Sequence, residues 1–192
     1  MEHTYTPENT GSYRRRIQIE DCLYENMLHT PYHSISVTDI CRQVGISRKA
    51  VYNYYHDKDA CLRAIISRTI RGALLHIASN TPDNATPLEA CVSLLEYWKG
   101  CRQYFDVIQR NGLFYLVLEE NIRYILEEDK SLLDLLSTPE VKSDMDILCC
   151  YMASQQTLIL QWYSRGFDTP TEEMARKYLR IMHLPMISAP EE

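Results

Sequence analysis

The chain has 192 residues, of which 45% are hydrophobic and 24% charged, and its formal net charge is −6 at pH 7. Its length allows one large helical unit or two small domains with a real core. The negative charge argues against a protein that coats nucleic acid nonspecifically, and no apolar run approaches the roughly 18 residues of a membrane span. The N-terminus lacks the basic-then-apolar layout of a signal peptide, so we expect a cytoplasmic protein.

A polar N-terminal arm over residues 1–11 precedes the first predicted helix, which runs to about His29 and ends before Pro31. Three arginines at 14–16 either reach DNA phosphates or the minor groove, or belong to a solvated helix start.

Two short helices joined by a tight turn are predicted over residues 36–55. Ser36 and Asp39 have the spacing of a capping box, which starts a helix. Gly45 tolerates a left-handed backbone and ends that helix, and Ser47 caps the next one. Helix, glycine turn and helix form the helix-turn-helix pattern.

The second of these helices carries a polar face. Arg48, Lys49, Tyr52 and Asn53 cluster within about two turns. Arg and Lys pair with guanine edges, Asn pairs with adenine, and hydroxyl groups bond phosphates. An ordinary solvated helix face is the alternative on these features alone.

The run from Ile35 to Ile66 resembles the DNA-binding domain of the TetR/AcrR family of bacterial transcriptional regulators. The matching motifs are Ser36, Asp39-Ile40, Gly45-Ile46-Ser47, Tyr52-Asn53-Tyr54-Tyr55 and Lys58-Asp59-Ala60-Cys61-Leu62. Tyr54 and Tyr55 stand where the family commonly has His and Phe, and both keep an aromatic ring. The resemblance implies that Thr38 and Lys58 contact backbone phosphates while the second helix faces the groove. The expected DNA-binding residues are Thr38, Ser47, Arg48, Lys49, Tyr52, Asn53, Tyr54 and Lys58.

A long fourth helix is predicted from Asp57, its N-cap, to Asn80, and a polar linker follows over residues 80–87. The helix is long enough to link two layers of a protein. We therefore expect an N-terminal arm and helix-turn-helix domain over 1–57, a connecting helix and linker over 58–85, and a C-terminal ligand-binding and dimerisation domain over 86–192.

Further helices are predicted after the Thr86-Glu89 capping pattern, between Gly100 and Gly112, and over residues 113–128. By resemblance, a small apolar ligand enters this C-terminal bundle. Polar-tipped aromatic residues both enclose and orient such ligands, although aromatic residues at helical spacing also form ordinary core. The candidate ligand-binding residues are Trp98, Cys101, Tyr104, Phe105, Tyr115 and Tyr151.

A helix predicted from Thr138-Pro139 to about Arg165 carries apolar residues spaced four and three apart, as in a packing seam between helices. Gly166 ends it, and a final helix follows Thr169-Pro170. The resemblance places these two helices in a four-helix dimer interface, and core packing is the alternative. The predicted interface residues are Met145, Met152, Ile159, Trp162, Met174 and Tyr178.

The seven Cys residues lie mostly in apolar helical stripes and form no spaced metal quartet. We interpret them as reduced core residues, with Cys149 and Cys150 as the pair that a thiol sensor would use. The carboxylates over 119–129 have no nucleophile or His beside them. No catalytic residue, metal ligand or cofactor is predicted.

The sequence therefore predicts an all-α transcriptional regulator with an N-terminal three-helix helix-turn-helix domain and a C-terminal helical bundle. We expect a homodimeric repressor that binds a palindromic double-stranded operator and is released by a small-molecule effector. The alternative is a TetR-like coactivator whose C-terminal bundle binds a protein partner. A helical enzyme is disfavoured because no catalytic constellation is present.

Overall fold

The computed structural model describes residues 11–82, 84–127, 141 and 143–182, and all regular elements in these ranges are helical. The predicted all-α class is confirmed. The elements are α1 (Gly11–His29), η2 (Tyr32–Ser34), α2 (Val37–Val44), α3 (Arg48–Tyr52), α4 (Lys58–Asn80), α5 (Pro87–Gly100), α6 (Arg102–Arg110), α7 (Phe114–Glu127), α10 (Met145–Ser164) and α11 (Thr171–Met182). No helix in the described ranges combines the length and apolar character needed to cross a membrane.

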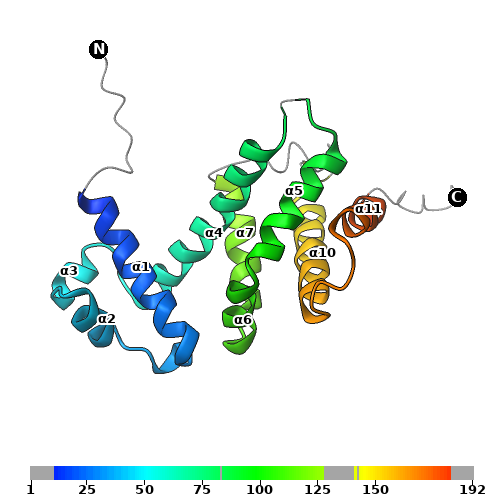
Figure 1. The fold of residues 1–192 in the computed structure, drawn as a ribbon. Helices are drawn as coiled ribbons and strands as arrows, with labels where there is room; N and C mark the ends of the chain where they lie inside the picture. The colour runs from blue at the N-terminus through cyan, green and yellow to red at the C-terminus, as the bar shows by residue number, and fades with distance from the viewer. Residues whose placement is uncertain (1–10, 83, 128–140, 142, 183–192) are drawn as a thin grey trace, which may run out of the picture.

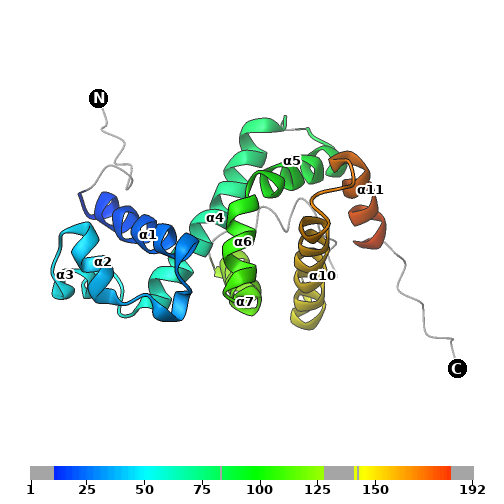
Figure 2. The same ribbon diagram turned by 60° about the horizontal axis from the view of Figure 1, so that its bottom comes forward.

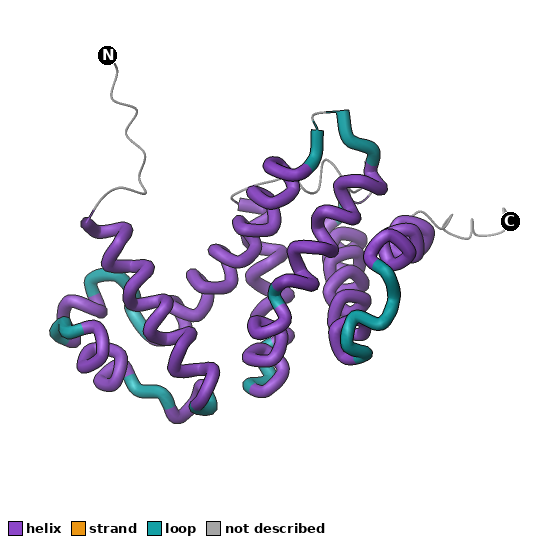
Figure 3. The backbone as a smooth tube through the Cα atoms, in the orientation of Figure 1, coloured by secondary structure: helices purple, strands orange, loops and turns teal. Residues whose placement is uncertain are grey.

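The helices form two groups that share α4. Helices α1, α2 and α3 lie at one end of the molecule, and α4 runs from them into the group formed by α5, α6, α7, α10 and α11 (Figure 1; Figure 2). Helix α4 packs against α1 on one side and against α5 and α7 on the other. Figure 3 shows short loops joining most neighbouring helices. Helix α4 is therefore the element that both groups share.

The helix boundaries in the N-terminal group follow from local caps. Ser36 and Asp39 form the predicted capping box, in which the Ser36 hydroxyl accepts from the Asp39 N–H at 3.1 Å. Gly45 has φ 71°, in the left-handed region, and ends α2. Ser47 accepts from the Ala50 N–H at 3.1 Å at the start of α3. The predicted helix-turn-helix is confirmed down to its caps.

The C-terminal boundaries agree with prediction except at α10. Thr86 and Glu89 cap α5 as expected. Helix α10 was predicted from Thr138-Pro139, which lie outside the described residues, but it begins at Met145. Asp144 has an extended backbone, and its carboxylate accepts from the N–H groups of the first turn, which starts the helix there.

Most residues of the predicted dimer seam are already buried within a single protomer. The buried members are Met152, Ile159, Trp162, Met174 and Tyr178, whereas Met145 is 52% exposed. Trp162 is 0% exposed and its indole N–H donates to the Thr169 carbonyl at 3.0 Å. A side chain already removed from water within one protomer has no area left to bury against a second copy. Spacings of four and three fit any helix packed on neighbours, so they did not distinguish core from interface.

Candidate nucleic-acid interface and C-terminal cavity

Helix α3 presents most of the predicted DNA-binding set to solvent. Val51 is buried and anchors the helix, while Ser47, Arg48, Lys49, Tyr52 and Asn53 are exposed. The Arg48 guanidinium donates to the Tyr52 hydroxyl at 3.4 Å, so these two side chains form one polar surface. Their donors and the Asn53 amide are the groups that read base edges in a major groove.

The remaining predicted contacts differ in accessibility. Thr38 is exposed near the start of α2, and Tyr54 is half-buried. The ammonium group of Lys58 donates to the carbonyls of Tyr32 and Ile35 at 2.6 and 2.8 Å. Its nitrogen also lies 4.1 Å from the centroid of the Tyr32 ring. Lys58 therefore fixes the loop before α2 in this conformation, a role that the sequence did not indicate.

Polar contacts at a buried carboxylate join α1 to α4 and to the loop between α3 and α4. The Tyr55 hydroxyl donates to Glu20 Oε1 at 2.5 Å, and Arg68 Nε lies 3.1 Å from Glu20 Oε2. Arg68 also donates to Asp21 at 2.6 Å. Burial raises the pKa of Glu20, and the Tyr55 hydrogen bond and the Arg68 charge oppose part of that rise. The segment that follows α3 is thus held by α1, and α1 is in turn held by α4.

Helix α6 contacts the N-terminal group directly. Arg110 donates to the Leu28 carbonyl at 2.5 Å, near the end of α1. The Asn111 side-chain oxygen accepts from the Tyr32 N–H at 2.6 Å. The loop between α1 and α2 is therefore bonded to α6 through Tyr32 N–H and to α4 through the Tyr32 carbonyl.

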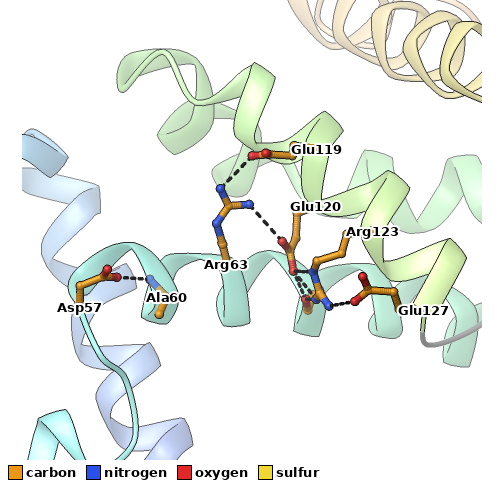
Figure 4. A network of polar contacts seen from close by, with 8 residues as sticks. Asp57, Ala60, Arg63, Glu119, Glu120, Arg123 and Glu127 are labelled. Atoms are coloured by element: carbon orange, nitrogen blue, oxygen red, sulfur yellow. Dashed lines mark hydrogen bonds and ion pairs between the residues drawn. The ribbon is translucent and has the colours of Figure 1, made fainter.

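An ion-pair network joins α4 to α7 (Figure 4). Arg63 contacts Glu119 at 2.8 Å and Glu120 at 3.4 Å. Glu120 is 1% exposed and also accepts from Arg123 at 2.5 Å and from Ser67 at 2.6 Å. Burial alone raises the pKa of Glu120, but the hydrogen bonds from Arg123 and Ser67 outweigh it and lower that pKa below 4.5. Glu120 is therefore ionised at neutral pH and holds α7 on α4.

A small cavity of about 50 Å³ lies among α4, α5, α6, α7 and α10. Its lining is Ile70, Ala73, Leu94, Trp98, Tyr104, Phe105, Val117, Asn121, Ile125, Met152, Gln155, Gln156 and Ile159. Three predicted ligand-binding residues, Trp98, Tyr104 and Phe105, thus lie together at one cavity. None of the lining residues is charged.

The other three predicted ligand-binding residues lie elsewhere. Tyr115 is 78% exposed on α7, because its position faces away from α4 and α10. Tyr151 is buried against α11, where it accepts from the Tyr178 hydroxyl at 2.9 Å. Cys101 lines a separate pocket with Tyr24 of α1 and Tyr97 of α5. Helical periodicity shows which residues share a face but not which neighbour that face meets, so it could not separate these positions.

Sequence reasoning did not assign Asn121, Gln155 and Gln156 to the cavity. Gln155 lies among the α10 residues that are spaced four and three apart. An uncharged amide within this apolar stripe was the sequence signal that could have indicated a polar group at a cavity. The described residues hold no group of three or more His, Cys, Asp or Glu side chains placed to bind a metal ion.

Comparison with known proteins gives a family match for one segment and a shared fold for most of the chain. Residues 26–65 match the family described as bacterial regulatory proteins, tetR family. A search of curated protein sequences gave no match. A TetR-like transcriptional regulator from Rhodococcus is 17% identical, with 88% of this chain and 93% of that chain covered and a TM-score of 0.51.

Two further solved structures share the fold. Thermus thermophilus FadR, a TetR-family repressor in complex with lauroyl-CoA, is 18% identical, with 92% and 100% of the two chains covered and a TM-score of 0.53. Mycobacterium smegmatis LfrR in complex with proflavine is 16% identical, with coverages of 92% and 99% and a TM-score of 0.52. Residues 26–65 thus match the tetR family of bacterial regulatory proteins, and the chain shares the fold of TetR-like transcriptional regulators.

Proposed function

We propose that this regulator binds an operator through α3 and that a small molecule bound in the C-terminal cavity releases it, so that the protein acts as a repressor. The observation that carries the proposal is the exposed polar face of α3, anchored by buried Val51 and by the Tyr55–Glu20 bond. Arg48, Lys49 and Asn53 supply the donors that read guanine and adenine edges.

The proposal requires two copies of the chain, because one reading helix covers a half-site and a two-fold partner supplies the second, roughly 34 Å away. The outer face of α10 is our candidate for that contact. Residues 147–164 contain no charged side chain, and Cys150, Ser154 and Thr157 are exposed on this face. The hydroxyls of Ser154 and Thr157 donate to carbonyls of their own helix at 2.8 Å. Their polar groups are therefore already paired, which suits close helix packing.

Helices α6 and α7 couple the cavity to the N-terminal group of helices and to α4, because each of them contacts both sides. Tyr104 and Phe105 of α6 line the cavity, while Arg110 and Asn111 beyond them bond the α1–α2 region. Helix α7 likewise has Asn121 at the cavity and Glu120 on α4. A ligand that widens the cavity displaces helices that hold the reading head, and so shifts the population away from the operator-competent state.

A protein partner in place of a small molecule is less well supported. That alternative calls for a large exposed apolar patch and no cavity. The exposed large hydrophobic residues in the described ranges are Tyr52, Leu75, Tyr115 and Met145, which lie on four different helices. LfrR and FadR, which share the fold, are described in complex with proflavine and lauroyl-CoA.

The test begins by selecting the operator from a random pool of duplex DNA and measuring affinity by gel shift. Arg48→Ala combined with Asn53→Ala should lower affinity for the selected site by at least tenfold, since each good base contact contributes about 1–3 kcal/mol. Arg102→Ala, an exposed arginine on α6, is the matched control and should bind normally. Undiminished binding by the double variant would refute the assignment of α3 as the reader.

A further inference from the structure

The C-terminal cavity gathers polar groups that have no partners. Gln155 is 7% exposed, and neither its amide nor that of Asn121 forms a hydrogen bond with the described residues. The Oε1 atom of Gln156 is buried and has no partner among the described residues. The buried Tyr104 hydroxyl also lacks a partner, but its neighbours Cys101, Tyr97 and Tyr24 line the separate pocket that Tyr104 also borders. The three amide side chains come from α7 and α10 and line one cavity that is otherwise largely apolar.

Such a concentration of unpaired groups is costly. Proteins pair nearly all buried polar groups, and a buried group left unpaired destabilises the fold. Gln156 Oε1 is such a group, and the amides of Asn121 and Gln155, which are not fully buried, line the same cavity with hydrogen-bonding capacity that a bound molecule can satisfy.

The lining also limits the charge of that molecule. No Asp, Glu, His, Lys or Arg among the described residues borders the cavity, and transfer of an unpaired charge into such a site is strongly unfavourable. Glu120 and Arg123 lie nearby on α7, but Glu120 is already paired with Arg63, Ser67 and Arg123. A charged ligand has no counter-charge to meet.

The volume limits its size. A cavity of about 50 Å³ holds small groups, whereas an engineered protein cavity that binds benzene measures about 150 Å³. A single ring therefore fits only if the walls move apart, and larger molecules require correspondingly more movement.

The orientation of the Gln156 amide determines which ligand group, a donor or an acceptor, can bind it. Gln156 Nε2 donates to the Phe114 carbonyl at 2.8 Å, so its Oε1 is free to accept. The Gln155 and Asn121 amides each both donate and accept. A ligand hydroxyl can donate to Gln156 and accept from Gln155 or Asn121.

We infer that the cavity binds a compact, uncharged molecule of about one ring that carries a hydroxyl or amide group, rather than a purely apolar or ionised one. This inference rests on the proposed function, because it specifies the chemical class of the effector.

The experiment uses the full chain and isothermal titration calorimetry at pH 7 with phenol, toluene and benzoate as probes. Phenol should bind at least tenfold more tightly than toluene, and benzoate should give no binding. Gln155→Leu should reduce the preference for phenol while keeping toluene binding. Gln109→Leu, at an exposed position of α6, should behave like the unaltered protein.

Asn121→Ala provides a second variant if Gln155→Leu does not fold, and it should reduce the preference in the same direction. Equal binding of phenol and toluene, tighter binding of benzoate, or no binding of phenol would each overturn the inference. A gel shift with the selected operator separates the two proposals. Retention of DNA at saturating phenol would refute release by the effector while supporting the ligand class, and equal phenol and toluene binding would refute the class while leaving DNA recognition intact.

Discussion

The hydrogen bonds of Lys58 to neighbouring groups determine what this side chain does in the folded chain. The resemblance implied a phosphate contact, but the ammonium already donates to two carbonyls of the loop before α2. Burial lowers the pKa of Lys58, and the nearby Asp59 charge opposes that effect. A substitution at Lys58 therefore acts on the position of α2 and α3 as well as on any direct attraction to DNA. Its effect on affinity alone cannot identify it as a phosphate contact.

Gly45 provides a residue-scale prediction about stability. Its φ of 71° lies in the left-handed region, which an alanine adopts at a cost of about 1–2 kcal/mol. Gly45→Ala should therefore lower the free energy of unfolding by that amount in urea titration. Gly100→Ala is the control, because a Cβ there meets nothing within 4 Å and the residue ends α5 without a positive φ. A loss of equal size in both variants would contradict the backbone explanation.

At the scale of elements, α6 and α7 each connect the cavity to a different part of the N-terminal group. Helix α6 bonds the loop after α1, and α7 bonds α4 through Glu120. The two contacts use different chemistry, since α6 makes hydrogen bonds to backbone groups through Arg110 and Asn111, whereas α7 uses an ion-pair network. They can therefore be weakened separately.

The α6 contact is testable by native-state hydrogen exchange. Asn111→Ala removes the acceptor of the Tyr32 N–H, a loss worth about 1 kcal/mol for one hydrogen bond. Exchange of the Tyr32 amide should become about fivefold faster, while amides of α10 should keep their rates. Gln109→Ala serves as control on the same helix. Unchanged exchange at Tyr32 would show that this bond does not hold the loop.

The α7 contact is testable through its pH dependence. The pKa of Glu120 is lowered in the folded chain, so the unfolded carboxyl, with its usual value of 4.5, takes up a proton first as the pH falls. The stabilisation is complete above that value and is lost as the pH falls through the folded pKa. Glu120→Gln should lower the free energy of unfolding by about 1–3 kcal/mol at pH 7 and flatten the acid limb of the stability curve.

Glu127 provides the matched control, because it pairs with the same Arg123 but its side chain is 63% exposed. Glu127→Gln should change the free energy of unfolding by less than about 1 kcal/mol. If both variants lose stability equally and keep the same acid limb, burial of Glu120 is not what makes the network stabilising.

The ends of the N-terminal helices could be predicted from the sequence because local caps and a glycine turn determine them. The cavity could not be predicted, because its lining depends on tertiary packing. Ser36, Gly45 and Ser47 act on their own turns, so their sequence spacing was enough to place α2 and α3. Tyr104 and Tyr115 look alike in sequence, yet one is buried and the other is 78% exposed. That difference depends on how α6 and α7 pack, which no local pattern records.

At the scale of the whole molecule, α6 and α7 connect the cavity to α1–α4. A ligand that widens the cavity would therefore have to move these two helices. Shifting a two-state equilibrium from 1:99 to 99:1 requires about 5.5 kcal/mol of differential binding. Each hydrogen bond that a ligand forms only in the widened cavity contributes about 0.5–1.5 kcal/mol net. Under the proposed mechanism, an effector must therefore combine hydrogen bonds to Asn121, Gln155 and Gln156 with burial of its apolar part.

The last prediction concerns the contact between two copies. Ser154→Arg places a charge on the outer face of α10 and should give folded monomers in sedimentation velocity, with lost operator affinity because a single head covers a half-site. Gln103→Arg, at an exposed position of α6, should remain dimeric. Trp162→Glu buries an unpaired charge in the core and should unfold the chain, which circular dichroism will show. An unchanged dimer for Ser154→Arg would exclude the outer face of α10, and folded monomers for Trp162→Glu would restore the interface that the sequence suggested.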